Sequence, residues 1–140
     1  MQVIIYTNET GNVSVCSPTG ELPIEEVLAK DCPAGAIIVD ASTLPEEYNE
    51  FFNAWVLNDA VVSVDFTKAQ EITKDRLRAE RTPLLQALDV AQLRNLADPV
   101  VLADIEAKKQ VLRDATQQVD SLTTLDELKA AQLPVLELSA

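Results

Sequence analysis

The sequence contains no histidine, three glycines, two cysteines and six aromatic residues among its 140 positions. Without histidine, the chain cannot form a Ser-His or Cys-His nucleophile pair, and it lacks the commonest protein base near neutral pH. Three scattered glycines do not make a glycine-rich phosphate loop. Cys16 and Cys32 lack CxxC spacing and are too few for a disulfide framework, so we expect reduced structural thiols.

Long apolar runs are also missing. Nowhere do 18 apolar residues follow one another, which predicts no membrane-spanning helix. The first residues, MQVIIYTNETG, have no basic region, so we expect no signal peptide and synthesis in a cytosol. Carboxylates at Glu25 and Glu26, and at Glu46, Glu47 and Glu50, lie where helices are expected to begin and do not follow a calcium-loop spacing. The residues therefore predict no catalytic, metal or cofactor site.

Basic residues are scarce in the first half of the chain. The net charge is -12, and residues 1–65 contain eleven acidic residues with Lys30 as the only base. Such a surface repels nucleic acid and anionic lipid. The simplest interpretation is a surface that keeps the protein soluble, and the alternative is an acidic docking face.

The residues that are present in this half predict a small α+β head over residues 1–65. Strands are expected at 2–6, 12–16 and 36–40, and a short helix at 24–30. The continuous β-branched run AIIVD at 36–40 is expected in the centre of the sheet. A helical turn follows to about Phe52, and residues 54–57 and 60–65 form a second hairpin with Trp55 as its core anchor.

A helical hairpin is predicted for residues 66–116. Leu77, Leu84, Leu88 and Ala91 recur at helical spacing, and Leu85, Leu93 and Leu96 are expected to widen this apolar stripe. Asp98-Pro99 is a helix stop followed by a start, because Asp caps free amides and proline suits the first helical position. Pro83 removes one backbone hydrogen bond, so a kink or a restart capped by Thr82 is expected there.

Antiparallel pairing around the Asp98-Pro99 turn predicts partners whose residue numbers sum to about 196. Apolar residues then face apolar residues, as in Leu84 with Leu112 and Ala91 with Ile105. The same rule places Leu77 by Val119, Asp89 by Lys108, and Arg81 by Asp114.

The arm is expected to continue to residue 134. Thr124 to Glu127 has the form of a capping box and predicts a third short helix that Pro134 ends. Residues 135–140 form an apolar tail that is either frayed or docked on a partner. The fold class predicted is therefore α+β, with a head at 1–65, a helical hairpin arm of coiled-coil type at 66–134 and a tail.

Several phrases of the sequence resemble a family of small proteins encoded with the tail genes of tailed bacteriophages. They are FFNAW at 51–55, VDFTKA at 64–69, DRLRAER at 75–81, PLLQALDV at 83–90 and KQVLRD at 109–114. The resemblance spans roughly residues 30–134. It implies a tail-tip or tail-fibre component, or a tail-fibre assembly chaperone, and it supplies no catalytic residues.

We therefore hypothesise a non-enzymatic tail protein, in the virion tail or in the host cytoplasm during assembly. Its partners would be other tail proteins or a second copy of itself, with no membrane and no cofactor. An apolar ridge on the arm is expected to carry the interface, through Leu77, Leu84, Leu88, Ile105 and Leu112. Alternatives are a nucleic-acid-binding regulator that uses the basic cluster of Lys74, Arg76, Arg78 and Arg81, and an enzyme that uses carboxylates alone.

Overall fold

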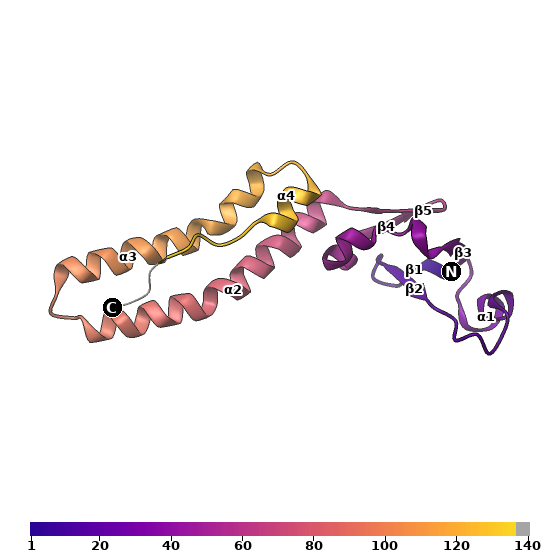
Figure 1. The fold of residues 1–140 in the computed structure, drawn as a ribbon, viewed down its shortest axis with the longest axis horizontal. Helices are drawn as coiled ribbons and strands as arrows, with labels where there is room; N and C mark the ends of the chain where they lie inside the picture. Colours follow the sequence, from indigo (N-terminus) through magenta and orange to yellow (C-terminus); the bar gives the residue numbers. More distant parts are fainter. Residues whose placement is uncertain (137–140) are drawn as a thin grey trace. The chain divides into compact units, whose positions relative to one another are not determined.

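The structure, a computed structural model, describes residues 1–136 and has an α+β fold, with antiparallel strands followed by long helices (Figure 1). The chain divides into two compact units, Met1–Ala69 and Gln70–Ala140. We call them the N-terminal unit and the hairpin unit. The division lies inside the long helix α2, a few residues after the predicted end of the head at residue 65.

The first sheet of the N-terminal unit has the strand order β2-β1-β3, with both pairs antiparallel. The strands are β1 (Gln2–Thr7), β2 (Val13–Cys16) and β3 (Ile37–Asp40), and helix α1 (Ile24–Asp31) lies between β2 and β3 in sequence. The strands and the helix were all predicted. The centre of the sheet is β1, however, so the prediction that residues 36–40 occupy it was wrong.

The physical reason is burial on both faces. Val3, Ile4 and Ile5 of β1 are almost fully buried, whereas the apolar residues of β3 are only half-buried. Three consecutive buried side chains require cover on both faces of a strand, because successive side chains point to opposite sides. The strand whose apolar residues are buried on both faces, β1, is therefore the central one.

A second, two-stranded sheet is formed by β4 (Trp55–Asn58) and β5 (Val61–Val64), as predicted. Asp59 in the turn has φ of 55°, a left-handed conformation that Asp tolerates better than most residues. Two 3-10 segments, η1 (Ala41–Thr43) and η2 (Glu46–Ala54), precede this sheet.

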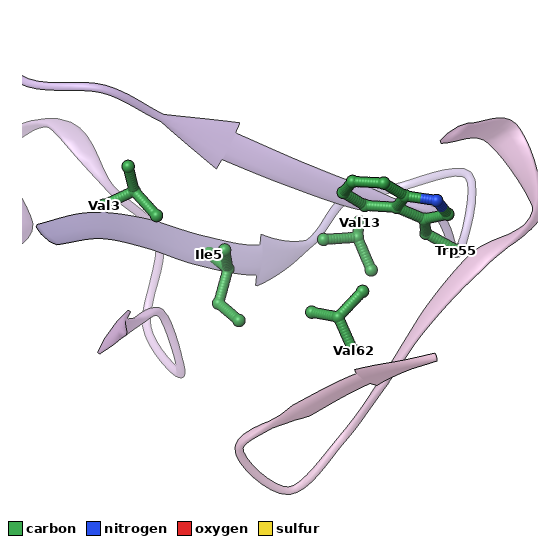
Figure 2. Close-up of a cluster of buried hydrophobic side chains, with 5 residues drawn as sticks. All are labelled: Val3, Ile5, Val13, Trp55 and Val62. Carbon is green, nitrogen blue, oxygen red and sulfur yellow. The ribbon is translucent and has the colours of Figure 1, made fainter. Parts of the chain in front are cut away.

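The core of the N-terminal unit lies where the two sheets meet. Its buried members are Val3, Ile5, Val13, Trp55 and Val62. Figure 2 shows Val13 and Val62 directed toward one another, with the indole ring of Trp55 beside them. The indole Nε1 donates a hydrogen bond to the carbonyl of Tyr48 at 3.3 Å, which satisfies the one polar atom of this buried ring.

The hairpin unit is built from α2 (Phe66–Arg94) and α3 (Pro99–Asp114), which run antiparallel (Figure 1). As predicted, the Asp98 carboxylate accepts hydrogen bonds from the amides of Val100 and Val101 at the start of α3. After α3 come η3 (Ala115–Ser121) and α4 (Leu125–Ala130), and the Thr124 hydroxyl caps α4 by accepting from the Glu127 amide.

The predicted restart at Pro83 is not observed. Helix α2 is continuous through Pro83, and the Thr82 hydroxyl donates back to the carbonyl of Arg78 at 2.9 Å instead of capping a new helix. Packing residues lie on both sides of the proline, with Leu77 and Leu88 almost fully buried. This packing stabilises α2 on both sides of Pro83 and offsets the missing backbone hydrogen bond.

Candidate functional site

The residues predicted to form the interface lie inside the hairpin unit's own core. Leu77 and Leu112 are fully buried, Leu88 and Ile105 nearly so, and Leu84 packs half-buried against the same group. The prediction of an open apolar ridge therefore has to be corrected. The physical reason is that α2 and α3 present their stripes to each other, and the pair leaves little of either stripe exposed.

The segment after α4 adds to this cover. Leu136 packs against the cluster of Leu88, Ala91, Ile105 and Leu112. Arg76 fixes the beginning of the segment, because its guanidinium donates to the carbonyls of Leu128 at 3.3 Å and Ala131 at 2.8 Å. The predicted tail at 135–140 is described only for Val135, which is exposed, and Leu136; residues 137–140 lie outside the described residues.

Lys109 forms the main polar link between α2 and α3. Its ammonium group is 2.5 Å from the Asp89 carboxylate and donates to Gln92 Oε1 at 2.6 Å, while its side chain is only 7% exposed. The predicted partner of Asp89 was Lys108, which instead pairs with Asp104 on its own helix. The pairing predicted from residue numbers that sum to about 196 therefore differs by one residue here, because the partner of Asp89 is Lys109 and not Lys108.

Arg81 also differs from the prediction. Its guanidinium donates to the carbonyls of Arg113 at 2.9 Å and Leu112 at 3.4 Å, and not to Asp114. These carbonyls belong to the last turn of α3, at the negative end of the helix dipole. A cation is favourable at such an end.

The remaining basic residues of the 74–81 cluster are also engaged within the hairpin unit. Lys74 pairs with Asp120 at 2.8 Å, and this hydrogen bond raises the pKa of Lys74. Arg76 holds the carbonyls named above, and Arg78 pairs with Asp75 at 2.7 Å. A recognition helix needs free cationic side chains for phosphates and base edges, so these contacts count against the nucleic-acid alternative.

Exposed apolar side chains gather at the turn between α2 and α3. Leu93, Leu96 and Val100 are 70%, 67% and 78% exposed. We call these three residues the hairpin tip. Leu93 and Leu96 were expected to widen the buried stripe, but Leu93 follows Leu88 by five residues and so lies about 140° around the helix from it. This angle between Leu88 and Leu93 could have indicated from the sequence that Leu93 lies outside the buried stripe.

The charges at the hairpin tip are few. The Asp98 carboxylate is engaged in capping α3. Arg94 is exposed, and in the described part of the chain it has no ion-pair partner. The tip therefore presents apolar surface together with one available cation, a composition typical of protein contact surfaces.

The N-terminal unit contains shallow cavities. One cavity of about 430 Å³ is lined by Val15, Leu44, Phe52 and Trp55, with Glu46 and Asn49 at its polar side. Within residues 1–136 no group of three or more Cys, Asp or Glu side chains is arranged to hold a metal ion. Trp55 is buried in the core of this unit.

Comparison with known proteins gives no match to a family model, to a curated protein or to a solved structure. Among residues 1–136, no helix has the length and apolar character needed to cross a membrane.

Proposed function

We propose that this protein is a non-enzymatic component of a bacteriophage tail that works by contact with other tail proteins. It serves either as a structural part of the tail tip or fibre or as an assembly chaperone for the tail fibre. Its place is accordingly the virion tail, or the host cytoplasm during assembly. The proposal is supported by the resemblance to phage tail-associated proteins of the phrases at residues 51–55, 64–69, 75–81, 83–90 and 109–114.

The observation that carries the contact mechanism is the hairpin tip. Leu93, Leu96 and Val100 expose most of their apolar surface within a short stretch around one turn. Exposed apolar residues are ordinary when they are scattered, but a group of them at one place indicates an interaction site. Arg94, which has no ion-pair partner among residues 1–136, favours a partner surface that offers apolar side chains together with a carboxylate.

The rest of the hairpin unit serves as the support of this tip. Its aliphatic core is closed by α3 and by Leu136, and the cross-helix links of Lys109 and Arg81 hold the two helices together. A contact surface on a rigid support loses less conformational freedom on binding than one on a flexible loop. The geometry thus suits a protein that presents one end to a partner.

Co-expression with bacteriophage tail-tip and tail-fibre proteins would test the proposal. The wild-type protein is expected to co-elute with one of them, and a Leu93→Ser/Leu96→Ser variant is expected to bind at least about tenfold more weakly, because anchor residues at interfaces contribute more than about 1 kcal/mol. Val61→Ser, at a 65% exposed position of the N-terminal unit, is the matched control and should bind like the wild type.

Three further measurements separate the alternatives. Light scattering detects self-association, which the same tip variant should abolish if the partner is a second copy. A mobility shift of duplex DNA at low salt would favour the nucleic-acid alternative. Mass spectrometry of purified particles separates a permanent subunit from a chaperone. A strict monomer that binds no tail protein would contradict the proposal.

A further inference from the structure

The register of the first sheet places Cys16 on a definite face. Cys16 is directly opposite Ile4 of β1, and Ile4 is directly opposite Ile38 of β3. Directly opposed residues on neighbouring strands share a face. The neighbours in sequence, including Val3 and Ile5, point to the other face, where the core with Trp55 lies. Cys16 therefore points away from that core.

Helix α1 covers the face to which Cys16 points. It contacts both β1 and β3, and it ends at Asp31 with Cys32 as its C-terminal capping residue. A cavity of about 260 Å³ is lined by Cys16 from β2 together with Val27 and Asp31 from α1. The end of β2 and the end of α1 thus meet at one place, although fifteen residues separate the two cysteines.

Cys32 directly follows Asp31 of the cavity lining, so its thiol lies near that of Cys16. Desolvation by the surrounding protein raises the pKa of the Cys32 thiol, and interaction with the Cys16 thiol and with the Asp31 carboxylate raises it further. Both side chains are half-buried and free, so small reagents can reach them. A raised pKa means that less thiolate is present at neutral pH and that reaction of Cys32 accelerates as the pH increases.

We propose that Cys16 and Cys32 are a modification site at which a reversible intramolecular disulfide closes the 17–31 loop. The chemistry is thiol–disulfide exchange with a low-molecular-weight disulfide such as oxidised glutathione. One cysteine thiolate attacks it, forms a mixed disulfide and releases one glutathione thiolate, which takes up a proton. The second cysteine loses its proton, attacks the protein sulfur of the mixed disulfide and releases the second glutathione.

The exchange is balanced in atoms and electrons. Two protein thiols and one oxidised glutathione give one protein disulfide and two reduced glutathione molecules, so the protein loses two hydrogen atoms. The bond would tie the C-terminal end of α1 to the end of β2 across the cavity. It restricts the unfolded chain more than the folded one, because the end of β2 and the end of α1 already meet in the fold.

The test uses the full chain, purified with both thiols reduced and then incubated with oxidised glutathione at neutral and at mildly alkaline pH. Intact mass should fall by two hydrogen atoms with no glutathione attached, and digestion should release one peptide pair joined through Cys16 and Cys32. Oxidation should be faster at the higher pH and should be reversed by a dithiol reductant. The Cys16→Ser and Cys32→Ser variants should each retain one glutathione instead.

A thermal scan gives a second readout that does not depend on these variants. Fluorescence of Trp55, the only tryptophan, should report a midpoint at least about 4 °C higher for the oxidised wild-type protein than for the reduced protein. Two glutathione molecules on the wild-type protein, a disulfide between two copies, or no reaction in the folded state while the unfolded chain reacts would each overturn the proposal.

Discussion

The N-terminal unit and the hairpin unit are stabilised by different means. All six aromatic residues fall within residues 1–66, and the core there is an interlocked group between two sheets. The hairpin unit beyond has no aromatic residue, and its core is a narrow seam of aliphatic side chains. Its polar links reach across the sequence, from Lys109 to Asp89, Lys74 to Asp120 and Arg76 to Ala131.

This difference shows how each unit sets the alignment of its elements. In a sheet, a slip of one residue moves every side chain to the other face, so the backbone register and the apolar pattern specify one another. A seam of similar aliphatic residues between two helices discriminates less between alignments. The hairpin unit compensates with two pairs of charged side chains from different segments, Lys109 with Asp89 and Lys74 with Asp120.

Removal of a seam residue should have the largest effect. Leu112→Ala deletes a fully buried side chain and should destabilise the hairpin unit by about 2–5 kcal/mol through lost burial and a residual cavity. Circular dichroism follows the helices, while Trp55 fluorescence follows the N-terminal unit. The helical transition should shift far more than the fluorescence transition, and equal shifts would mean that the two units unfold together.

Replacement of the proline in α2 should stabilise the hairpin unit, in contrast to Leu112→Ala. Pro83 is exposed, and Pro83→Ala supplies an amide hydrogen for the helix without disturbing the seam. The gain in helix propensity, less the greater freedom of the unfolded chain, should stabilise the hairpin unit by about 1–3 kcal/mol. Urea unfolding followed by circular dichroism measures it. A destabilised variant would show that α2 depends on the proline.

Removal of either partner of the Lys109–Asp89 ion pair should destabilise the hairpin unit, but by different amounts. Asp89→Ala leaves the buried ammonium with Gln92 alone and should cost about 1–2 kcal/mol, because Asp89 itself is 63% exposed. Lys109→Met should cost less, since an apolar chain of similar length fits the seam. The double variant should be more stable than Asp89→Ala. Chemical unfolding of all four proteins completes the cycle, and strict additivity would show that the two side chains act independently.

Lowering the pH should produce the smallest change in stability. One carboxylate in each unit, Asp40 and Glu127, is expected to respond. The Ser42 amide and hydroxyl lower the pKa of Asp40 below 3.8, and the hydroxyls of Thr123 and Thr124 lower the pKa of Glu127 below 4.5. Both groups are exposed. For a lowered folded pKa, the stabilisation is complete above the unfolded value and is lost as the pH falls through the folded one.

Substitution of these carboxylates distinguishes the acid response of one unit from that of the other. Asp40→Asn should reduce the acid sensitivity of the Trp55 fluorescence midpoint below about pH 3.8, and Glu127→Gln should do so for the helical midpoint below about pH 4.5. The measurement is a series of thermal scans from neutral pH downward. Unchanged pH profiles in both variants would show that these hydrogen bonds do not contribute to folding.

Local signals in the sequence predicted most elements of both units. The Asp98-Pro99 start, the Thr124 cap and the strand pairs were found because each depends on a few neighbouring residues. The central position of β1 was missed because it depends on which strand is buried on both of its faces, and this is decided by the other elements of the fold. The restart that was one of the two expectations at Pro83 does not occur, because packing on both sides of the proline outweighs the local penalty.

The burial of the predicted interface residues was harder to predict for a related reason. The aliphatic stripe indicated which residues needed cover, but it did not indicate that α3 and Leu136 of the same chain supply it. The acceptors that fix Arg81 and Arg76 are main-chain carbonyls, which have no signature in the sequence. As a result, residues of the chain's own core were expected at an interface, while the exposed tip was counted as part of the stripe.

The enclosed ammonium of Lys109 limits how far the two helices can slide. A displacement of α3 by one helical turn, about 5.4 Å, would carry the cation away from both acceptors and into aliphatic surroundings. Such a stranded charge costs several kcal/mol. Misaligned pairings formed during folding would therefore be short-lived, and only the alignment that brings Asp89 and Gln92 to the same nitrogen would persist.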